Sequence, residues 1–173
     1  PAYTLVIKLD RINDYKNLFK HLYETAGPRF MKSFSLLKSI FGGKSLPDEE
    51  QRALFEELLF LTLARASRTD LDTAEVEVDI ICKILEQHGV KVTAQEVRLA
   101  SMSELYEDAP LEKYLAKGGQ QLNIAHRQDI ISGLLSVVKG DGVVGAAEAE
   151  FFNLVAEALD LSPIHLVGVT VDG

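Results

Sequence analysis

The chain has 173 residues, of which 47% are hydrophobic and 25% charged, with one cysteine and no tryptophan. A chain of this length buries about 70% of its unfolded surface, so it can fold as one globular domain without disulfides or a structural metal. The single cysteine excludes a disulfide framework and a thiolate zinc cluster. No apolar run reaches the roughly 18 to 20 residues that cross a bilayer, and the N-terminus lacks a signal-peptide pattern. We therefore expect a cytoplasmic protein.

The net charge of −8 is unevenly distributed along the chain. Residues 1–45 carry eight basic and three acidic side chains, a balance of +5, whereas residues 46–173 carry ten basic and 23 acidic side chains, a balance of −13. We expect a basic N-terminal segment over residues 1–45, followed by an acidic helical domain over residues 46–173. Binding to nucleic acid needs clustered basic residues on the binding domain, so we expect no nucleic-acid partner.

The basic segment begins with residues 3–9, whose β-branched and aromatic side chains predict a short strand. A helix is predicted over residues 29–41, where Phe30, Phe34, Leu37 and Phe41 form an apolar stripe at helical spacing. Two interpretations stay open. In the first, the helix is an interaction element that lies on an anionic membrane or docks onto a partner. In the second, its apolar stripe packs on the acidic domain as ordinary core.

The next predicted helix begins near Ser45 and runs to about Ser67. Gly42-Gly43 ends the preceding helix, and Ser45-x-x-Asp48 resembles a capping box. Apolar side chains surround this helix almost completely, which predicts a central position in the fold. An amphipathic helix follows a short polar loop, with Asp72 as N-cap and Glu75 at the third helical position.

Further helices are predicted near residues 93–107 and 110–117. Thr93-x-x-Glu96 is a capping box at the start of the first, and Gly118-Gly119 ends the second. Residues 125–139 are again apolar nearly all round, about 73 residues after the first such helix. They too are followed by a short polar loop and an amphipathic helix, which indicates an internal duplication. Residues 166–171 predict a short terminal strand.

The two loops can be aligned in two registers. Capping favours a register in which Glu75 matches Glu148. A register shifted by two residues instead matches Asp70 with Asp141 and Glu77 with Glu148. The sequence leaves both open.

The second copy reads Asp-Gly-x-apolar-x-x-x-Glu and then continues as an amphipathic helix ending in AxxLxLSP. The residues of this pattern are Asp141, Gly142, Val144, Glu148, Phe152, Ala156, Leu159, Leu161 and Pro163. At these positions the chain resembles the tellurite-resistance TerB-like family. The resemblance covers roughly residues 50–165 and is weaker in the first copy. It implies an all-α fold, a duplicated multihelical bundle around two central helices. It also implies a role in resistance to tellurite and other stresses, acidic loop residues that bind metal ions, and no established enzymatic reaction.

A divalent-cation site, for calcium, magnesium or zinc, is one hypothesis for the acidic loops. Hard cations need several converging carboxylate and carbonyl oxygens. The candidate ligands are Asp141, Glu148, Glu75, Asp70 and Asp72. The alternative is structural: Glu148 satisfies a free backbone N–H, and Asp141 shapes a turn with Gly142. Neither loop has the ligand spacing of an EF-hand.

No enzymatic motif stands out. Gly43-Lys44-Ser45 lacks the earlier glycine and the preceding strand of a phosphate-binding loop. Cys82 lies on a predicted helix, where a packed thiol is expected. His126-x-x-Asp129 has helical spacing, for which an ordinary hydrogen bond or a solvated face is the better interpretation. We expect a non-enzymatic stress-response module that binds protein partners. Attachment to the surface of the inner membrane and a homodimer stay as alternatives.

Overall fold

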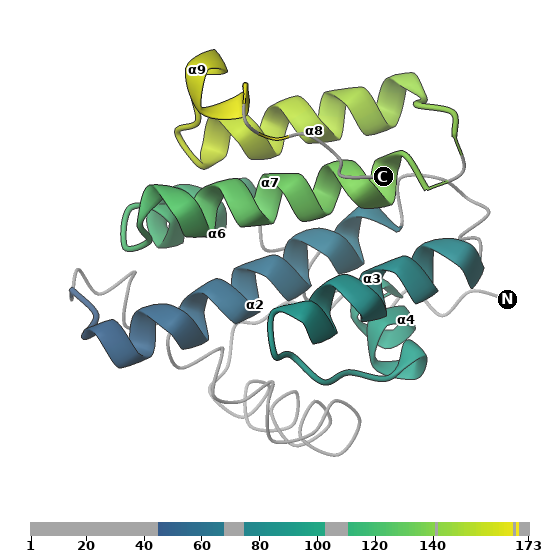
Figure 1. Cartoon of the computed structure of the whole chain (residues 1–173), viewed down its shortest axis with the longest axis horizontal. Coiled ribbons are helices and arrows are strands. Elements are labelled where there is room, and N and C mark those ends of the chain that lie inside the picture. The colour runs from purple at the N-terminus through teal and green to yellow at the C-terminus, as the bar shows by residue number, and fades with distance from the viewer. Residues whose placement is uncertain (1–44, 68–74, 103–110, 141, 168, 170–173) are drawn as a thin grey trace, which may run out of the picture.

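A computed structural model describes residues 45–67, 75–102, 111–140, 142–167 and 169. The described residues form helices and no strands, which confirms the all-α fold class. The elements in chain order are α2 Asp48–Ala66, α3 Glu75–Gln87, α4 Ala94–Met102, α6 Leu111–Gly119, α7 Ile124–Val138, α8 Ala146–Ala158 and α9 Pro163–Leu166 (Figure 1). Within this part of the chain, no helix is long and apolar enough to cross a membrane.

Two helices form the centre of the bundle, as the sequence predicts. Helix α2 contacts α3, α4, α6, α7 and α8, and α7 contacts α2, α3 and α8. Both helices carry side chains that are completely buried, among them Leu59 and Leu63 of α2 and Ile130 and Leu134 of α7. Helix α2 is buried nearly all round from Leu54 onward, and α7 is buried mainly in its second half, from Ile130 to Val138. Helices that are apolar on several sides pack against several neighbours.

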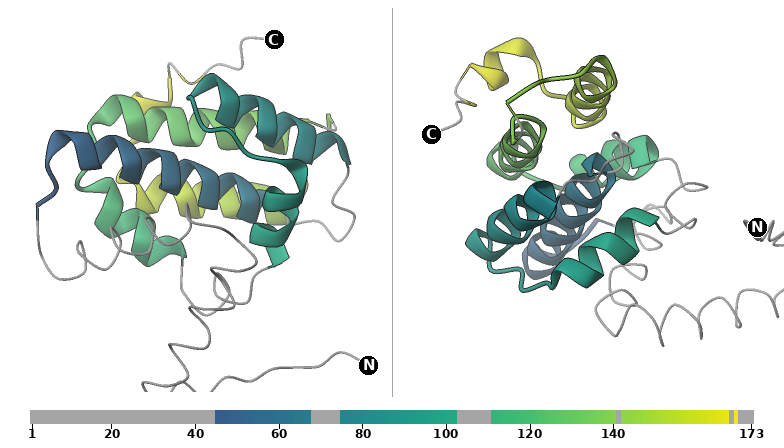
Figure 2. Two further views of the ribbon diagram at one scale, coloured as in Figure 1. Left: turned by 90° about the horizontal axis from the view of Figure 1, so that it is seen from below. Right: turned by 90° about the vertical axis from the view of Figure 1, so that its right-hand side faces the viewer.

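The two central helices begin equivalent helix-loop-helix units. In Figure 1, α2 and α7 run in the same direction, and α3 and α8 return beside them. The views in Figure 2 show the same pairing of α2 with α3 and of α7 with α8. The chain therefore connects both pairs at the same end of the bundle, which is the arrangement expected of an internal duplication.

Glycines allow the helices to approach closely. A Cβ atom at Gly118 would lie 2.6 Å from Leu58 Cδ1, and one at Gly119 would lie 3.3 Å from Leu159 Cδ2. Helix α6 ends at Gly119, which confirms that Gly118-Gly119 closes this helix; the two glycines are its last residues, and both are buried. They are needed for packing against α2 and α8, a tertiary contact that a local capping rule cannot detect.

The structure tests two predicted capping boxes. Thr93 and Glu96 form theirs: Thr93 N–H donates to Glu96 Oε2 at 2.7 Å, and Glu96 N–H donates to Thr93 Oγ1 at 3.2 Å. The box at Ser45 is wrong, because α2 begins at Asp48 with Pro47 as N-cap. A residue that precedes proline is disfavoured in the helical conformation, so Leu46 does not begin the helix.

The predicted strand over residues 166–171 is also wrong where it can be seen. Leu166 ends α9, and Val167 has helical backbone angles. Ser162 and Pro163 start this helical turn, since proline fits the first helical position. The predicted strand over residues 3–9 and helix over residues 29–41 lie outside the described residues.

Candidate functional site

The candidate site is the end of the bundle at which α2 is followed by α3 and α7 is followed by α8. Helix α7 ends beside α3: a Cβ atom at Gly140 would lie 2.6 Å from Ile80 Cδ1 and 3.0 Å from the Val137 carbonyl oxygen. The segment that leaves α7 is therefore packed against the first unit. The helix ends that flank the two loops, namely the last residues of α2 and α7 and the first residues of α3 and α8, lie at this same end of the bundle.

The second loop contains a turn that requires glycine. Gly142 has a φ of +82° and is exposed, and its N–H donates to the Lys139 carbonyl at 3.0 Å. Residues with a side chain are disfavoured in this left-handed region. The backbone conformation therefore explains why glycine follows Asp141 in the sequence. Asp141 itself lies outside the described residues.

Glu148 caps the N-terminus of α8. Its Oε2 accepts a hydrogen bond of 2.7 Å from the N–H of Gly145, the N-cap residue. This is half of a capping box, because Gly145 has no side chain to return the bond. The bond occupies part of the carboxylate only, since an ionised carboxylate has about four acceptor positions. The structural role predicted for Glu148 is thus present, and it leaves acceptor capacity.

The first loop is less completely described. Asp70 and Asp72 lie outside the described residues. Glu75 is the first residue of α3, and its side chain is likewise outside what the structure describes. Whether these carboxylates converge with Asp141 on a metal ion therefore stays a prediction.

The C-terminal ends of α3 and α8 decide between the two registers. Each helix is followed, two residues after its last residue, by a residue with positive φ, Gly89 at +79° and Asp160 at +54°, and these are 160 − 89 = 71 residues apart. The flanking backbone bonds match as well. His88, Gly89 and Val90 donate to Ile84, Glu86 and Leu85, and Leu159, Asp160 and Leu161 donate to Val155, Glu157 and Ala156.

A separation of 71 residues matches Asp70 with Asp141 and Glu77 with Glu148. It also pairs Ile84, which is 9% exposed, with the fully buried Val155, whereas the register favoured by capping pairs Ile84 with exposed Glu157. Glu77 is 7% exposed. The residue of α3 that corresponds to Glu148 is therefore the buried Glu77 and not Glu75. Aligning the helices from their C-terminal ends would have indicated this.

The other candidate groups are used in packing or capping. His126 stacks on Phe55 with ring centroids 4.4 Å apart, and His88 meets the same ring edge-on at 5.4 Å. His165 Nδ1 lies 3.0 Å from Ser162 Oγ and 3.2 Å from Ser162 N. Burial, and after it the charge of Asp79, raises the pKa of the Cys82 thiol. Among the residues that the structure describes, no three histidine, cysteine, aspartate or glutamate side chains are grouped to hold a metal ion.

Comparison with known proteins identifies the family. The family model described as "Tellurite resistance protein TerB" matches residues 45–169, which include both helix-loop-helix units and the loop motif at Asp141 and Glu148. Comparisons with curated proteins and with solved structures gave no match. The matched range covers well over half of the 173 residues. The chain therefore belongs to the TerB tellurite-resistance family.

Proposed function

We propose that the protein is a non-enzymatic stress-response module of the tellurite-resistance type, with an acidic, cation-binding surface at the loop end of the bundle. One observation carries the proposal: the end of α2 and the start of α3 lie at the same end of the molecule as the end of α7 and the start of α8. Because each connection contains aspartates, both copies can supply oxygen ligands to one region.

The composition of this region suits a hard divalent cation. Calcium, magnesium and zinc can all be coordinated by carboxylate oxygens. Calcium binds six to eight oxygen ligands at about 2.3 to 2.6 Å. Asp141 and, under the shorter repeat spacing, Asp70 would be equivalent ligands from the two loops. Asp72 would be a further ligand from the first loop. Glu148 has one oxygen engaged in its cap and retains acceptor positions.

A role without catalysis is supported by the state of the usual reactive groups. The Cys82 thiol has a raised pKa, which disfavours the nucleophilic thiolate. The described histidines stack on Phe55 or cap α9, and none forms a pair with an acid that would activate a nucleophile.

Calorimetric titration tests the cation site. We expect calcium, magnesium or zinc to give a saturable heat with the full chain. Asp141→Asn, which removes charge and keeps size, should weaken binding at least tenfold. Asp160→Asn is the matched control, because Asp160 is an exposed aspartate beyond the other end of α8. No heat at millimolar metal, or equal affinity in both variants, would contradict the proposal.

The second candidate is a protein-interaction scaffold or membrane-surface adaptor whose acidic loops are purely structural. The cap formed by Glu148 favours it, because this carboxylate already satisfies its own helix terminus. Under this alternative the basic segment, residues 1–45, attaches the protein to a partner or to the inner surface of the membrane. The titration separates the two candidates, since a scaffold gives no metal-dependent heat.

A further inference from the structure

Exposed large hydrophobic side chains occur as a group at each end of the described bundle, and a single further one, Leu154, lies within α8. At the loop end they are Val76, Val143 and Val144. At the opposite end, Ile124 is 42% exposed, Ile164 is 77% exposed and Val167 is 78% exposed. We call this second group the α7–α9 face. Large apolar side chains grouped in this way indicate a surface that another element covers.

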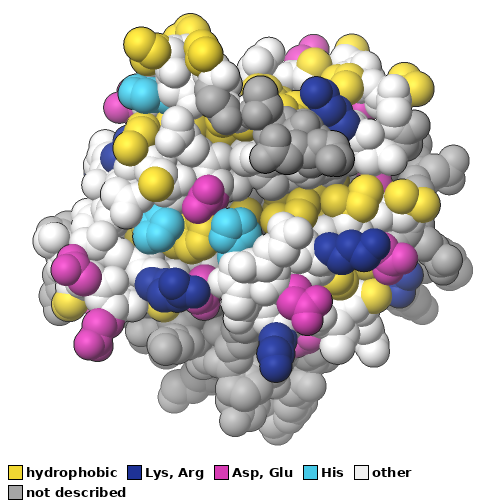
Figure 3. Space-filling model, viewed as in Figure 1, with side chains coloured by type: hydrophobic (Ala, Val, Ile, Leu, Met, Phe, Trp, Pro, Cys, Tyr) yellow, Lys and Arg dark blue, Asp and Glu magenta, His cyan; other side chains and the backbone are white. Residues whose placement is uncertain are grey.

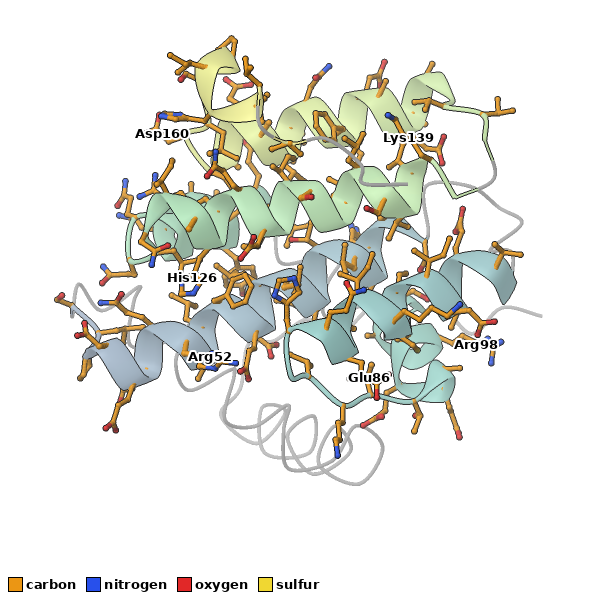
Figure 4. All side chains as sticks on the ribbon, viewed as in Figure 1. Arg52, Glu86, Arg98, His126, Lys139 and Asp160 are labelled. Carbon is orange, nitrogen blue, oxygen red and sulfur yellow. The ribbon has the colours of Figure 1, made fainter. Side chains whose placement is uncertain are left out.

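Hydrogen bonds hold the α7–α9 face together. Gln128 Nε2 donates to the His165 carbonyl at 2.7 Å, so α9 lies against the first half of α7. Ile124 is one helical turn before Gln128, on the same side of α7. Ile164 directly precedes His165 in α9. Figure 3 shows hydrophobic side chains on the same face of the molecule at α9 and near the start of α7, where Figure 4 labels His126.

The basic segment enters the described structure beside this face. Leu46 is buried, and its N–H donates to Gln121 Oε1 at 3.2 Å. Ile124 follows Gln121 by three residues, at the start of α7. Three residues, 42–44, separate Phe41 from Ser45, so Phe41 can reach about 14 Å from Ser45. Gly42-Gly43 permits the chain to reverse direction there.

The apolar group at the loop end is much farther away. Helix α2 has 19 residues, which makes it about 28 Å long, and the loop end lies beyond its C-terminus. Phe41 cannot reach that end across three linking residues. Of the two exposed apolar groups, only the α7–α9 face is available to the end of the predicted helix over residues 29–41.

Charge favours the same pairing. The predicted helix carries Arg29, Lys32 and Lys38 beside its apolar stripe. Acidic residues border the α7–α9 face: the first turn of α2 has Asp48, Glu49 and Glu50, and exposed Asp160 lies beside α9 (Figure 4). The nearby guanidinium of Arg127 donates to the carbonyls of Leu122 and Leu159 and keeps its positive charge. The four acidic residues named here outnumber it, so the basic side chains of the predicted helix have carboxylates to approach at this end of the bundle.

We propose that residues 29–41 dock as an amphipathic helix on the α7–α9 face of their own chain. The stripe formed by Phe30, Phe34, Leu37 and Phe41 is about 17 Å long, and it covers Ile124, Ile164 and Val167. The basic side chains lie toward the acidic border. The docking of this helix does not depend on a metal ion at the loop end. It can therefore be tested separately from the proposed cation site.

A tryptophan probe tests the docking, because the natural chain contains no tryptophan. In the full chain with Phe34→Trp, emission should be blue-shifted relative to the same chain unfolded in urea, at all protein concentrations. The substitutions Ile164→Asp and Val167→Asp together should move the emission toward the unfolded position. Both side chains are exposed, so the fold should persist, which circular dichroism checks.

Val143→Asp with Val144→Asp is the matched control at the loop end, and it should leave the emission blue-shifted. Emission at the unfolded position in the parent chain would overturn the proposal, as would a blue shift that survives Ile164→Asp with Val167→Asp. A blue shift that needs high protein concentration would assign the helix to a second copy. One that needs anionic vesicles would assign it to a membrane. Either outcome also overturns the proposal.

Cross-linking provides a second readout that does not depend on position 34. In a Cys82→Ser background, Phe41→Cys with Ile124→Cys should form an intramolecular disulfide under mild oxidation. Phe41→Cys with Val143→Cys should not form one, because residue 41 precedes the N-terminal end of α2 whereas Val143 lies at the loop end, beyond the C-terminal end of α2. A disulfide in the second pair and none in the first would exclude the proposed position of the helix.

Discussion

Glu148 has an observed structural role and is also one of the residues proposed to bind a metal ion. Its carboxylate accepts a hydrogen bond from Gly145 N–H at 2.7 Å, so it satisfies a backbone donor that the helix leaves free. The spacing between Gly145 and Glu148 predicts this role. The same type of pattern at Thr93 and Glu96 is confirmed, whereas the one at Ser45 and Asp48 is wrong. The difference is Pro47, whose ring restricts the residue before it.

Removing this cap should destabilise the fold by a modest amount. We expect Glu148→Ala to lower the free energy of unfolding by about 1 kcal/mol, the usual cost of losing a capping side chain. Glu150→Ala is the control, because Glu150 is exposed on the same helix, and it should change the free energy by less than about 0.5 kcal/mol. Urea denaturation of both variants measures the difference. Equal effects would show that the cap contributes nothing specific.

At the scale of the elements, glycines decide how closely the helices pack. Gly118 and Gly119 place α6 against α2 and α8, and Gly133 places α7 against Ile84, Leu59 and Leu63, with the nearest atom 3.3 Å from a hypothetical Cβ. The helices themselves are predictable from their apolar periodicity and caps. Their glycine contacts are not, because each depends on a residue far away in the sequence. The register favoured by capping, in which Glu75 matches Glu148, is wrong for a similar reason. Capping is a local signal, whereas the match of Glu77 with Glu148 follows from burial and from the C-terminal ends of the two helices.

The packing of α6 gives a prediction that runs against helix propensity. Alanine favours a helix interior over glycine by about 1 kcal/mol. Gly118→Ala should nevertheless destabilise the protein, by about 1 to 3 kcal/mol, because the new Cβ would lie 2.6 Å from Leu58 Cδ1 and Leu58 is completely buried. Thermal or urea unfolding measures the change.

A double-mutant cycle identifies the cause. Leu58→Val removes the δ carbons, so Gly118→Ala should cost clearly less in that background than in the natural chain. An equal cost in both backgrounds would mean that the clash with Leu58 is not responsible.

At the scale of the whole molecule, the duplication and the division of charge account for the proposed functions. The duplication is visible in the sequence as two buried helices, each followed by a polar loop and an amphipathic helix, and in the structure α2 and α7 run in the same direction with α3 and α8 returning beside them. It places the last residues of α2 and α7, which precede the two acidic loops, at one end of the bundle. The basic segment enters beside the opposite end, where exposed Ile164 and Val167 lie. The positions of Asp70, Asp72 and Asp141 relative to one another depend on loop conformations, which composition and spacing do not determine.

A crystal structure of the full chain soaked with calcium or zinc tests the central claim most directly. The claim is that the loops of the two copies form one cation-binding surface. We expect density for an ion, with an anomalous signal for zinc, within about 2.6 Å of carboxylate oxygens from Asp141 and from Asp70 or Asp72. Loops free of metal at saturating concentration, with these carboxylates turned back onto their own helix N-termini, would contradict the claim.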